Sequence, residues 1–146
     1  MVYAAPPSPP RSVALPPPPP PVQISITGWG EFNPIGGFAD GRYKLSRVEV
    51  KPGPDGAKKL ILTFTRKRGI FVYTQKEELL VKEWRDGLTL YYPPTGRSYT
   101  VQFTPIWKIE RRGGEYLATP HYRPVKVIIE RDRVHMELTF TPKMER

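Results

Sequence analysis

The chain has 146 residues and carries 23 Lys and Arg against 14 Asp and Glu, which gives a net charge of +9 at pH 7. Its length is that of one ordinary domain, and the lack of cysteine excludes disulfide bonds and thiolate metal sites. No apolar stretch approaches the ~18 residues of a membrane helix, and the N-terminal residues lack the pattern of a signal peptide. We therefore expect a cytoplasmic protein, or a component of a virus particle, without a membrane partner.

Ten of the 19 prolines lie within residues 1–21. Proline fixes φ and has no N–H, so such a segment favours an extended polyproline II conformation over a helix or a central strand. We predict a proline-rich extended arm over residues 1–21 and a single basic β domain over residues 22–146. The arm is either a spacer or a ligand for a protein partner or for a second copy of the chain.

The domain opens with alternation of apolar and polar residues from Val22 to Thr27, which is typical of a half-buried strand. The glycine-rich segment 28–41 is typical of a loop. A second strand is expected from Tyr43 to Val50. The phase of its apolar residues changes between Leu45 and Val48, which predicts a β-bulge.

Residues 60–65 and 70–74 form the next predicted hairpin. The only helix candidate follows, from Lys76 to Arg85. Acidic residues at 77 and 78, Arg85 near the end and the spacing of Leu79, Leu80, Glu83 and Trp84 all suit a short amphipathic helix.

The second half contains three predicted hairpins, built from residues 88–92 with 98–103, 106–110 with 115–118, and 125–130 with 134–140. In total we expect about nine strands and one helix. The predicted fold class is all-β, mainly antiparallel: a small barrel or sandwich of hairpins with one short helix, preceded by the proline-rich arm.

Catalytic and metal-binding motifs are not recognisable in the sequence. The only histidines, His121 and His135, lack metal-ligand spacing, and no serine lies in a nucleophile elbow. The glycines near Trp29 match neither of the phosphate-loop patterns. We therefore expect a protein that is not an enzyme and that needs no metal or other cofactor.

Basic residues recur at the predicted turns, and many of the 17 aromatic residues lie on strands of mixed polarity. Charges often gather at solvated turns and aromatic rings often pack in a core, so both features have a purely structural interpretation. Together they also suit contacts with phosphates and stacking on bases. The candidate nucleic-acid-binding residues are Arg66, Lys67, Arg68, Arg111, Arg112, Arg131, Arg133, Lys58, Lys59, Trp29, Tyr73, Tyr91 and Trp107.

The leading hypothesis is a non-catalytic protein that binds nucleic acid, with single-stranded DNA or RNA preferred. The alternative is a structural subunit of a virus particle or filament, which joins its neighbours through the proline-rich arm. One asparagine and three glutamines in the whole chain are few. This depletion, together with the lack of cysteine, suggests a thermophilic source, archaeal or viral.

Overall fold

The computed structural model describes residues 23–33 and 40–143. Strands dominate this part of the chain, and the only helical residues in it form one 3₁₀ turn, η2 (Pro54–Gly56). The strands are β1 (Gln23–Phe32), β2 (Gly41–Pro52), β3 (Lys58–Arg68), β4 (Phe71–Trp84), β5 (Gly87–Tyr92), β6 (Arg97–Gln102), β7 (Pro105–Arg112), β8 (Glu115–Tyr122), β9 (Val125–Arg131) and β10 (Val134–Lys143). The all-β prediction is confirmed. The predicted arm, residues 1–21, lies outside the described residues.

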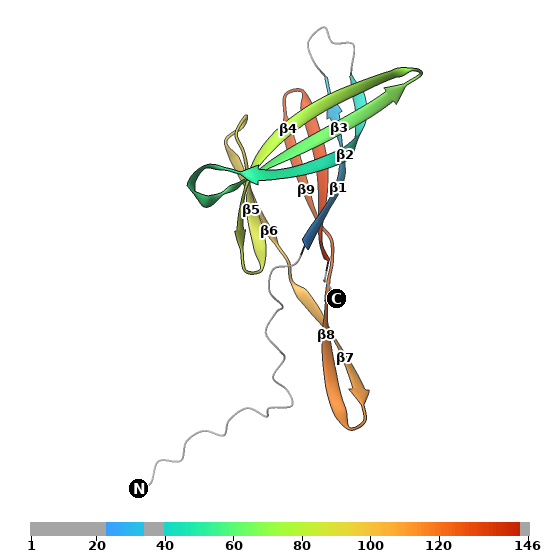
Figure 1. Cartoon of the computed structure of the whole chain (residues 1–146), viewed down its shortest axis with the longest axis vertical. Coiled ribbons are helices and arrows are strands. Elements are labelled where there is room, and N and C mark those ends of the chain that lie inside the picture. The colour runs from blue at the N-terminus through green and yellow to red at the C-terminus, as the bar shows by residue number, and fades with distance from the viewer. Residues whose placement is uncertain (1–22, 34–39, 144–146) are drawn as a thin grey trace.

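Eight of the strands form one antiparallel sheet that curls into a nearly closed barrel (Figure 1). Their order is β6-β5-β4-β3-β2-β1-β10-β9, so that the first and last strands of the chain are neighbours. The edge strands β6 and β9 lie against each other without forming a hydrogen-bonded ladder. Of the two predicted architectures, the barrel is therefore the one the chain adopts.

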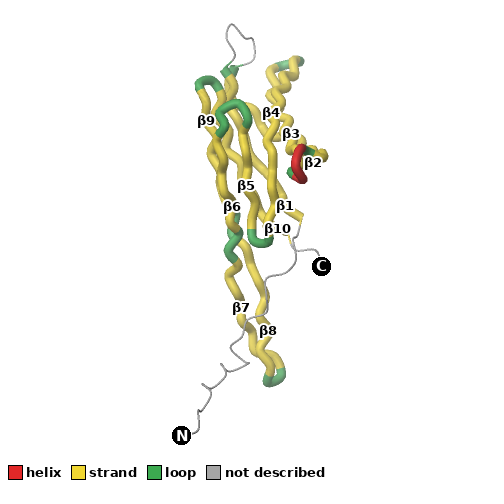
Figure 2. The backbone as a smooth tube through the Cα atoms, turned by 90° about the vertical axis from the view of Figure 1, so that its left-hand side faces the viewer, coloured by secondary structure: helices red, strands yellow, loops and turns green. Residues whose placement is uncertain are grey.

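The strands β7 and β8 form a separate two-stranded sheet that projects from one end of the barrel (Figure 2). β7 follows β6 after a break of two residues, and β8 leads into β9 after another such break. We call this end of the barrel the hairpin end. The turns between β3 and β4, β5 and β6, and β9 and β10 lie at the opposite end, the loop end (Figure 1).

Alternate residues of each strand point into the barrel and fill it. In β3, for example, Leu60, Leu62 and Phe64 are buried, whereas their neighbours are only partly so. An eight-stranded barrel is just wide enough to be filled by side chains. The core toward the loop end is aromatic, because the Phe32 ring contacts the rings of Tyr43 and Phe64, each at 5.2 Å between centroids.

The ladder between β1 and β2 is the shortest in the barrel. It has four pairs, from Trp29 with Lys44 to Phe32 with Gly41, all near the loop end. Beyond these pairs, toward the hairpin end, no pairing joins the two strands, although each remains paired with its other neighbour. The barrel wall is therefore continuous near the loop end and open between β1 and β2 near the hairpin end.

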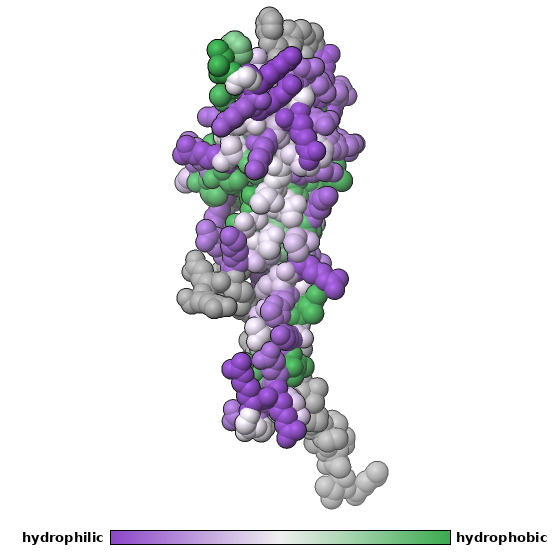
Figure 3. Space-filling view, turned by 90° about the vertical axis from the view of Figure 1, so that its right-hand side faces the viewer, coloured by the Kyte–Doolittle hydropathy of each residue, from purple (hydrophilic) through white to green (hydrophobic). Residues whose placement is uncertain are grey.

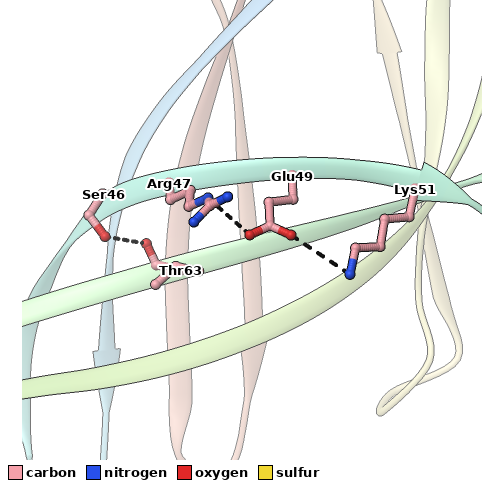
Figure 4. A network of polar contacts seen from close by, with 5 residues as sticks. All are labelled: Ser46, Arg47, Glu49, Lys51 and Thr63. Carbon is pink, nitrogen blue, oxygen red and sulfur yellow. Dashed lines mark hydrogen bonds and ion pairs between the residues drawn. The ribbon is translucent and has the colours of Figure 1, made fainter.

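The predicted bulge in β2 is confirmed, and Ser46 is the extra residue. Leu45 pairs with Phe64 and Arg47 pairs with Thr63, which leaves Ser46 without an opposite residue. Its hydroxyl donates a hydrogen bond to the carbonyl oxygen of Thr63 at 3.0 Å (Figure 4). Because the bulge adds one residue, Leu45 and Val48 both face the interior although three positions separate them.

The predicted helix over residues 76–85 is wrong, because these residues belong to the long strand β4 and the turn after it. Leu79 and Val81 are buried while Leu80 is only partly so, which is the period of a strand. A short apolar run satisfies the helical and the strand period equally well. Pairing with β3 along eleven residues and with β5 along five decides the conformation.

The predicted loop over residues 28–41 begins later than expected. β1 continues through the first two glycines to Phe32, which places Trp29 on a strand. Residues 34–39 lie outside the described residues. The glycines in β1 serve close packing, since a Cβ built on Gly28 would lie 2.2 Å from the carbonyl oxygen of Glu137.

One carboxylate points into the barrel near the loop end. Glu77 of β4 is 12% exposed; its carboxylate accepts a hydrogen bond of 2.9 Å from the Tyr92 hydroxyl and lies 3.8 Å from the guanidinium of Arg131. Burial raises the pKa of Glu77 above its usual range, although the hydrogen bond and the guanidinium both act to lower this pKa. Burial also raises the pKa of Tyr92, and the neighbouring Glu77 carboxylate adds to the rise.

A raised pKa means that the folded state binds the Glu77 proton more tightly than the unfolded state does. The resulting stabilisation is present at pH values below the ordinary pKa of 4.5 and is lost as the pH rises through the raised folded value. A Glu77→Gln variant stays neutral throughout. We expect thermal unfolding curves measured across this range to show a smaller loss of Tm in this variant than in the native chain.

The control is Glu78→Gln, because Glu78 faces outward and pairs with Lys59 at 3.3 Å. If the Tm values of the native and Glu77→Gln proteins changed in parallel with pH, the carboxylate of Glu77 would have the same pKa in the folded and unfolded states.

Candidate nucleic-acid interface

An open groove of about 550 Å³ lies beside the short ladder of β1 and β2. We call it the Trp29 groove. Its lining comes from three adjacent strands and consists of Gly28, Trp29, Arg42, Tyr43, Lys44, Thr65, Arg66 and Lys67. Four of these residues are basic and none is acidic, so the lining of the groove is positively charged.

The indole of Trp29 is the centre of this groove. The guanidinium of Arg42 lies over the ring, 4.2 Å from its centroid, and the imidazole of His135 lies 5.3 Å away at a tilt of 39°. Lys44 is the cross-strand partner of Trp29. The strand register explains this arrangement, because outward-facing residues of β1, β2 and β10 meet on one surface of the sheet.

Arg66 borders the groove, but its side chain lies on the inner face of the sheet. Its side chain is 25% exposed and lies 3.9 Å from a carboxylate oxygen of Asp40. The Nη1 atom of Arg66 is buried and makes no hydrogen bond to the part of the chain that the structure describes. A buried guanidinium N–H without an acceptor is costly. Because Arg66 follows Leu62 and Phe64 at alternate positions, its guanidinium lies on the inner face of the sheet, where its nearest described acceptor is Asp40.

Gly41 provides the space for this guanidinium. Its φ of +113° is one that side-chain-bearing residues rarely adopt, and an added Cβ would lie 2.9 Å from Nη1 of Arg66. The first residue of β2 is therefore a glycine for two reasons, its backbone conformation and the approach of Arg66.

The structure brings together Trp29, Arg66 and Lys67 from the predicted site residues. Arg68 ends β3 at the same loop end. Arg131 and Arg133 flank the nearby turn after β9, where the carbonyl of Arg133 accepts a hydrogen bond from the N–H of Asn33 at 2.9 Å. Arg131 contacts Glu77 inside the barrel, near the loop end.

Tyr73 is the cross-strand partner of Arg66, and the remaining predicted site residues lie away from the groove. Lys58 and Lys59 begin β3 at the hairpin end, where they pair with Glu83 at 3.0 Å and with Glu78 at 3.3 Å. Trp107, Arg111 and Arg112 lie on β7 of the projecting hairpin. Tyr73 on β4 packs against the core, and Tyr91 on β5 is exposed. The predicted set thus divides between the two ends of the molecule.

Sequence reasoning missed Arg42 and Lys44. They flank the buried Tyr43 at the start of β2 and face outward beside Trp29. Two basic residues at i and i+2 of a strand that follows a glycine-rich segment are the signal that could have identified them.

An apolar tip extends beyond the basic residues of β3. Ile70 is 91% exposed, and Phe71 and Val72 are each 61% exposed, at the turn into β4. The hydropathy surface shows this apolar tip at the upper left, close to strongly hydrophilic residues (Figure 3). The loop end therefore offers apolar and cationic groups side by side.

Models of known protein families, characterised proteins and solved structures give no match to this chain. Among the described residues, no helix is long and apolar enough to cross a membrane, and no cluster of His, Asp and Glu could hold a metal ion.

The role of Gly41 can be tested by Gly41→Ala. We expect a loss of unfolding free energy of about 1 kcal/mol or more, because the left-handed φ becomes strained and the new Cβ meets Arg66. Urea denaturation measures this loss.

Gly56→Ala is the matched control, since Gly56 also has a positive φ, of +75°, but nothing within 4 Å of an added Cβ. Equal losses in the two variants would show that Arg66 moves aside without cost.

Proposed function

We propose that the protein is a non-catalytic nucleic-acid-binding protein that prefers single strands and binds them in the Trp29 groove. The observation that supports this proposal is the meeting of one indole with three outward-facing cationic side chains, those of Arg42, Lys44 and Lys67. Aromatic and guanidinium planes stack unpaired bases, and a row of basic groups follows the phosphates of the strand.

The stacked pair of Trp29 and Arg42 suggests how a base binds. The exposed Arg42 already lies over the indole, so an unpaired base would stack on the outer face of the guanidinium and extend the column. Phosphates on either side would then reach Lys44 and Lys67. A base inside a duplex cannot enter such a column, which is why a single strand is preferred.

Fluorescence anisotropy with labelled single-stranded oligonucleotides tests the proposal. Removing two groove cations in the double variant Lys44→Ala, Lys67→Ala should weaken binding and lower the slope of log K against log salt by about 0.7 for each lost phosphate contact. Trp29→Ala should weaken binding by roughly tenfold, because stacking contributes about 1–3 kcal/mol per base.

The control removes the same charge from the hairpin end, in Lys58→Ala, Lys59→Ala. This variant should bind as the native chain does. Equal weakening by both double variants would mean that overall charge, and not the groove, holds the strand. Equal affinity for a duplex competitor would contradict the single-strand preference.

A second candidate function, as an assembly subunit, is favoured by the projecting hairpin. Residues directly opposite each other in β7 and β8 share a face. One face collects Trp107, Ile109, Tyr116, Ala118 and Pro120, with Arg111 opposite Tyr116 near the turn. We call it the hairpin face. Ile109 is 57% exposed and Tyr116 is 62% exposed. A two-stranded hairpin is marginal alone in water, so a cover over this face would stabilise it.

We propose a second copy of the chain as this cover, with the two hairpin faces packed about a two-fold axis. The proline-rich arm, residues 1–21, is the other proposed route of assembly.

Sedimentation of the full-length protein over a range of concentrations tests the assembly candidate. Ile109→Asp should abolish self-association, whereas Ile106→Asp, on the opposite face of β7, should not. Loss of self-association only on deletion of residues 1–21 would assign the contact to the arm. A protein that stays monomeric at high concentration contradicts the assembly candidate altogether.

A further inference from the structure

The barrel interior opens to solvent at the hairpin end in an apolar pocket of about 660 Å³. We call it the mouth pocket. Residues of β1, β2, β3, β4, β5 and β10 line it, and all but the first face inward: Gln23, Ile24, Ile26, Val48, Val50, Lys58, Leu60, Val81, Glu83, Leu88 and Phe140. It lies at the opposite end of the barrel from the Trp29 groove, so it is independent of the proposed nucleic-acid site.

The pocket exists because β1 and β2 separate. Their ladder stops at Trp29 and Lys44, and the inward residues beyond it have no partner across the gap. Val50 is 59% exposed although it points toward the interior, and Ile24, Ile26 and Val48 are only partly buried. An occupant that covered these apolar side chains would gain the free energy of removing them from water.

The lining specifies an aliphatic occupant. Seven of the lining residues are Ile, Val or Leu, and Phe140 is the only aromatic one among them. The volume lies within the range of roughly 300–1,000 Å³ that small-molecule sites occupy, and the mouths of barrels are a usual place for such sites. A flexible hydrocarbon chain fits these walls better than a flat ring does.

The rim specifies an uncharged polar head. Lys58 Nζ and Glu83 Oε2 lie 3.0 Å apart at the mouth, with their side chains 51% and 43% exposed. The ion pair is neutral as a unit, so a charged head would meet one opposite and one like charge. A hydroxyl can accept from the ammonium and donate to the carboxylate at the same time.

We propose that the mouth pocket is a binding site for one aliphatic molecule with an uncharged hydroxyl head. The hydrocarbon chain of the ligand enters between β1 and β2 and packs against Ile26, Leu60 and Phe140. The hydroxyl of the ligand stays at the rim beside Lys58 and Glu83. Binding is reversible and involves no covalent step.

Isothermal titration calorimetry of the full-length protein with decanol tests this proposal. We expect saturable binding at one site. Val50→Asp places a carboxylate in the pocket wall and should weaken binding of decanol by at least about tenfold. The reason is that the hydrocarbon chain of decanol can enter only if this unpaired carboxylate loses its water. Val50→Trp fills the mouth without adding a charge and should weaken it similarly.

Val72→Asp is the matched control, since Val72 is 61% exposed, almost as Val50 is, but lies at the loop end. It should bind decanol as the native chain does. Decanoate and decylamine, the charged analogues, should each bind more weakly than decanol. No saturable heat with decanol, or equal weakening by Val50→Asp and Val72→Asp, would overturn the site, and tighter binding of either charged analogue would overturn the assignment of the head. Nucleic-acid binding should be unchanged in Val50→Asp, so failure here leaves the proposed function unaffected.

Discussion

The ladder between β1 and β10 is the contact on which the barrel depends. It joins the two ends of the described chain through ten pairs, from Gln23 with Lys143 to Phe32 with Val134. All other ladders in the barrel connect strands that are consecutive in sequence, so each is formed by a local hairpin. Without this long-range pairing β9 and β10 would separate from the other six strands, and β1 and β10 would become two further free edges, which are templates for aggregation.

Both candidate sites follow from how β1 is held. Because β10 pairs with β1 along its full length while β2 pairs with only four of its residues, β1 belongs mainly to the β10 side of the barrel. Near the loop end the four pairs bring Trp29 beside Arg42 and Lys44, which makes a cationic groove on a closed wall. Near the hairpin end the wall is open and exposes the apolar interior. One strand thus gives the two ends of the barrel opposite chemistry.

The sequence predicted the hairpins and the bulge because both have local signals. Turn residues separate alternating runs, and the phase change between Leu45 and Val48 marks the extra residue whatever the rest of the fold is. It could not place β4 correctly, since the run through Leu79 to Trp84 satisfies a helix as well as a strand. Only pairing with β3 and β5, which lies outside any local window, separates the two.

The candidate site was predictable only in its parts. A basic turn such as Arg66 to Arg68 is visible in sequence, but its neighbours depend on register between strands that are distant along the chain. Trp29 meets Lys44 because of the β1–β2 ladder, and it meets His135 because of the β1–β10 ladder. The same registers place Lys58 and Arg111 at the other end of the molecule, although composition alone gives no reason to separate them from Arg66.

The charge patterns of two strands indicate which surfaces are available for assembly. β2 carries Arg47, Glu49 and Lys51 along its outer face, with ion pairs of 2.9 and 3.9 Å (Figure 4). β7 repeats the pattern of positive, negative and positive residues at alternate positions, with Glu110 between Lys108 and Arg112.

These are strands with an unpaired backbone edge, β2 along its part toward the hairpin end and β7 along its whole length. Charged side chains along an edge oppose the addition of a further strand, because the incoming chain must desolvate them. Growth by edge pairing is therefore disfavoured at both places. The apolar hairpin face and the mouth pocket carry no such charge ladder, so a partner or ligand at the hairpin end would contact side chains and not the backbone edges.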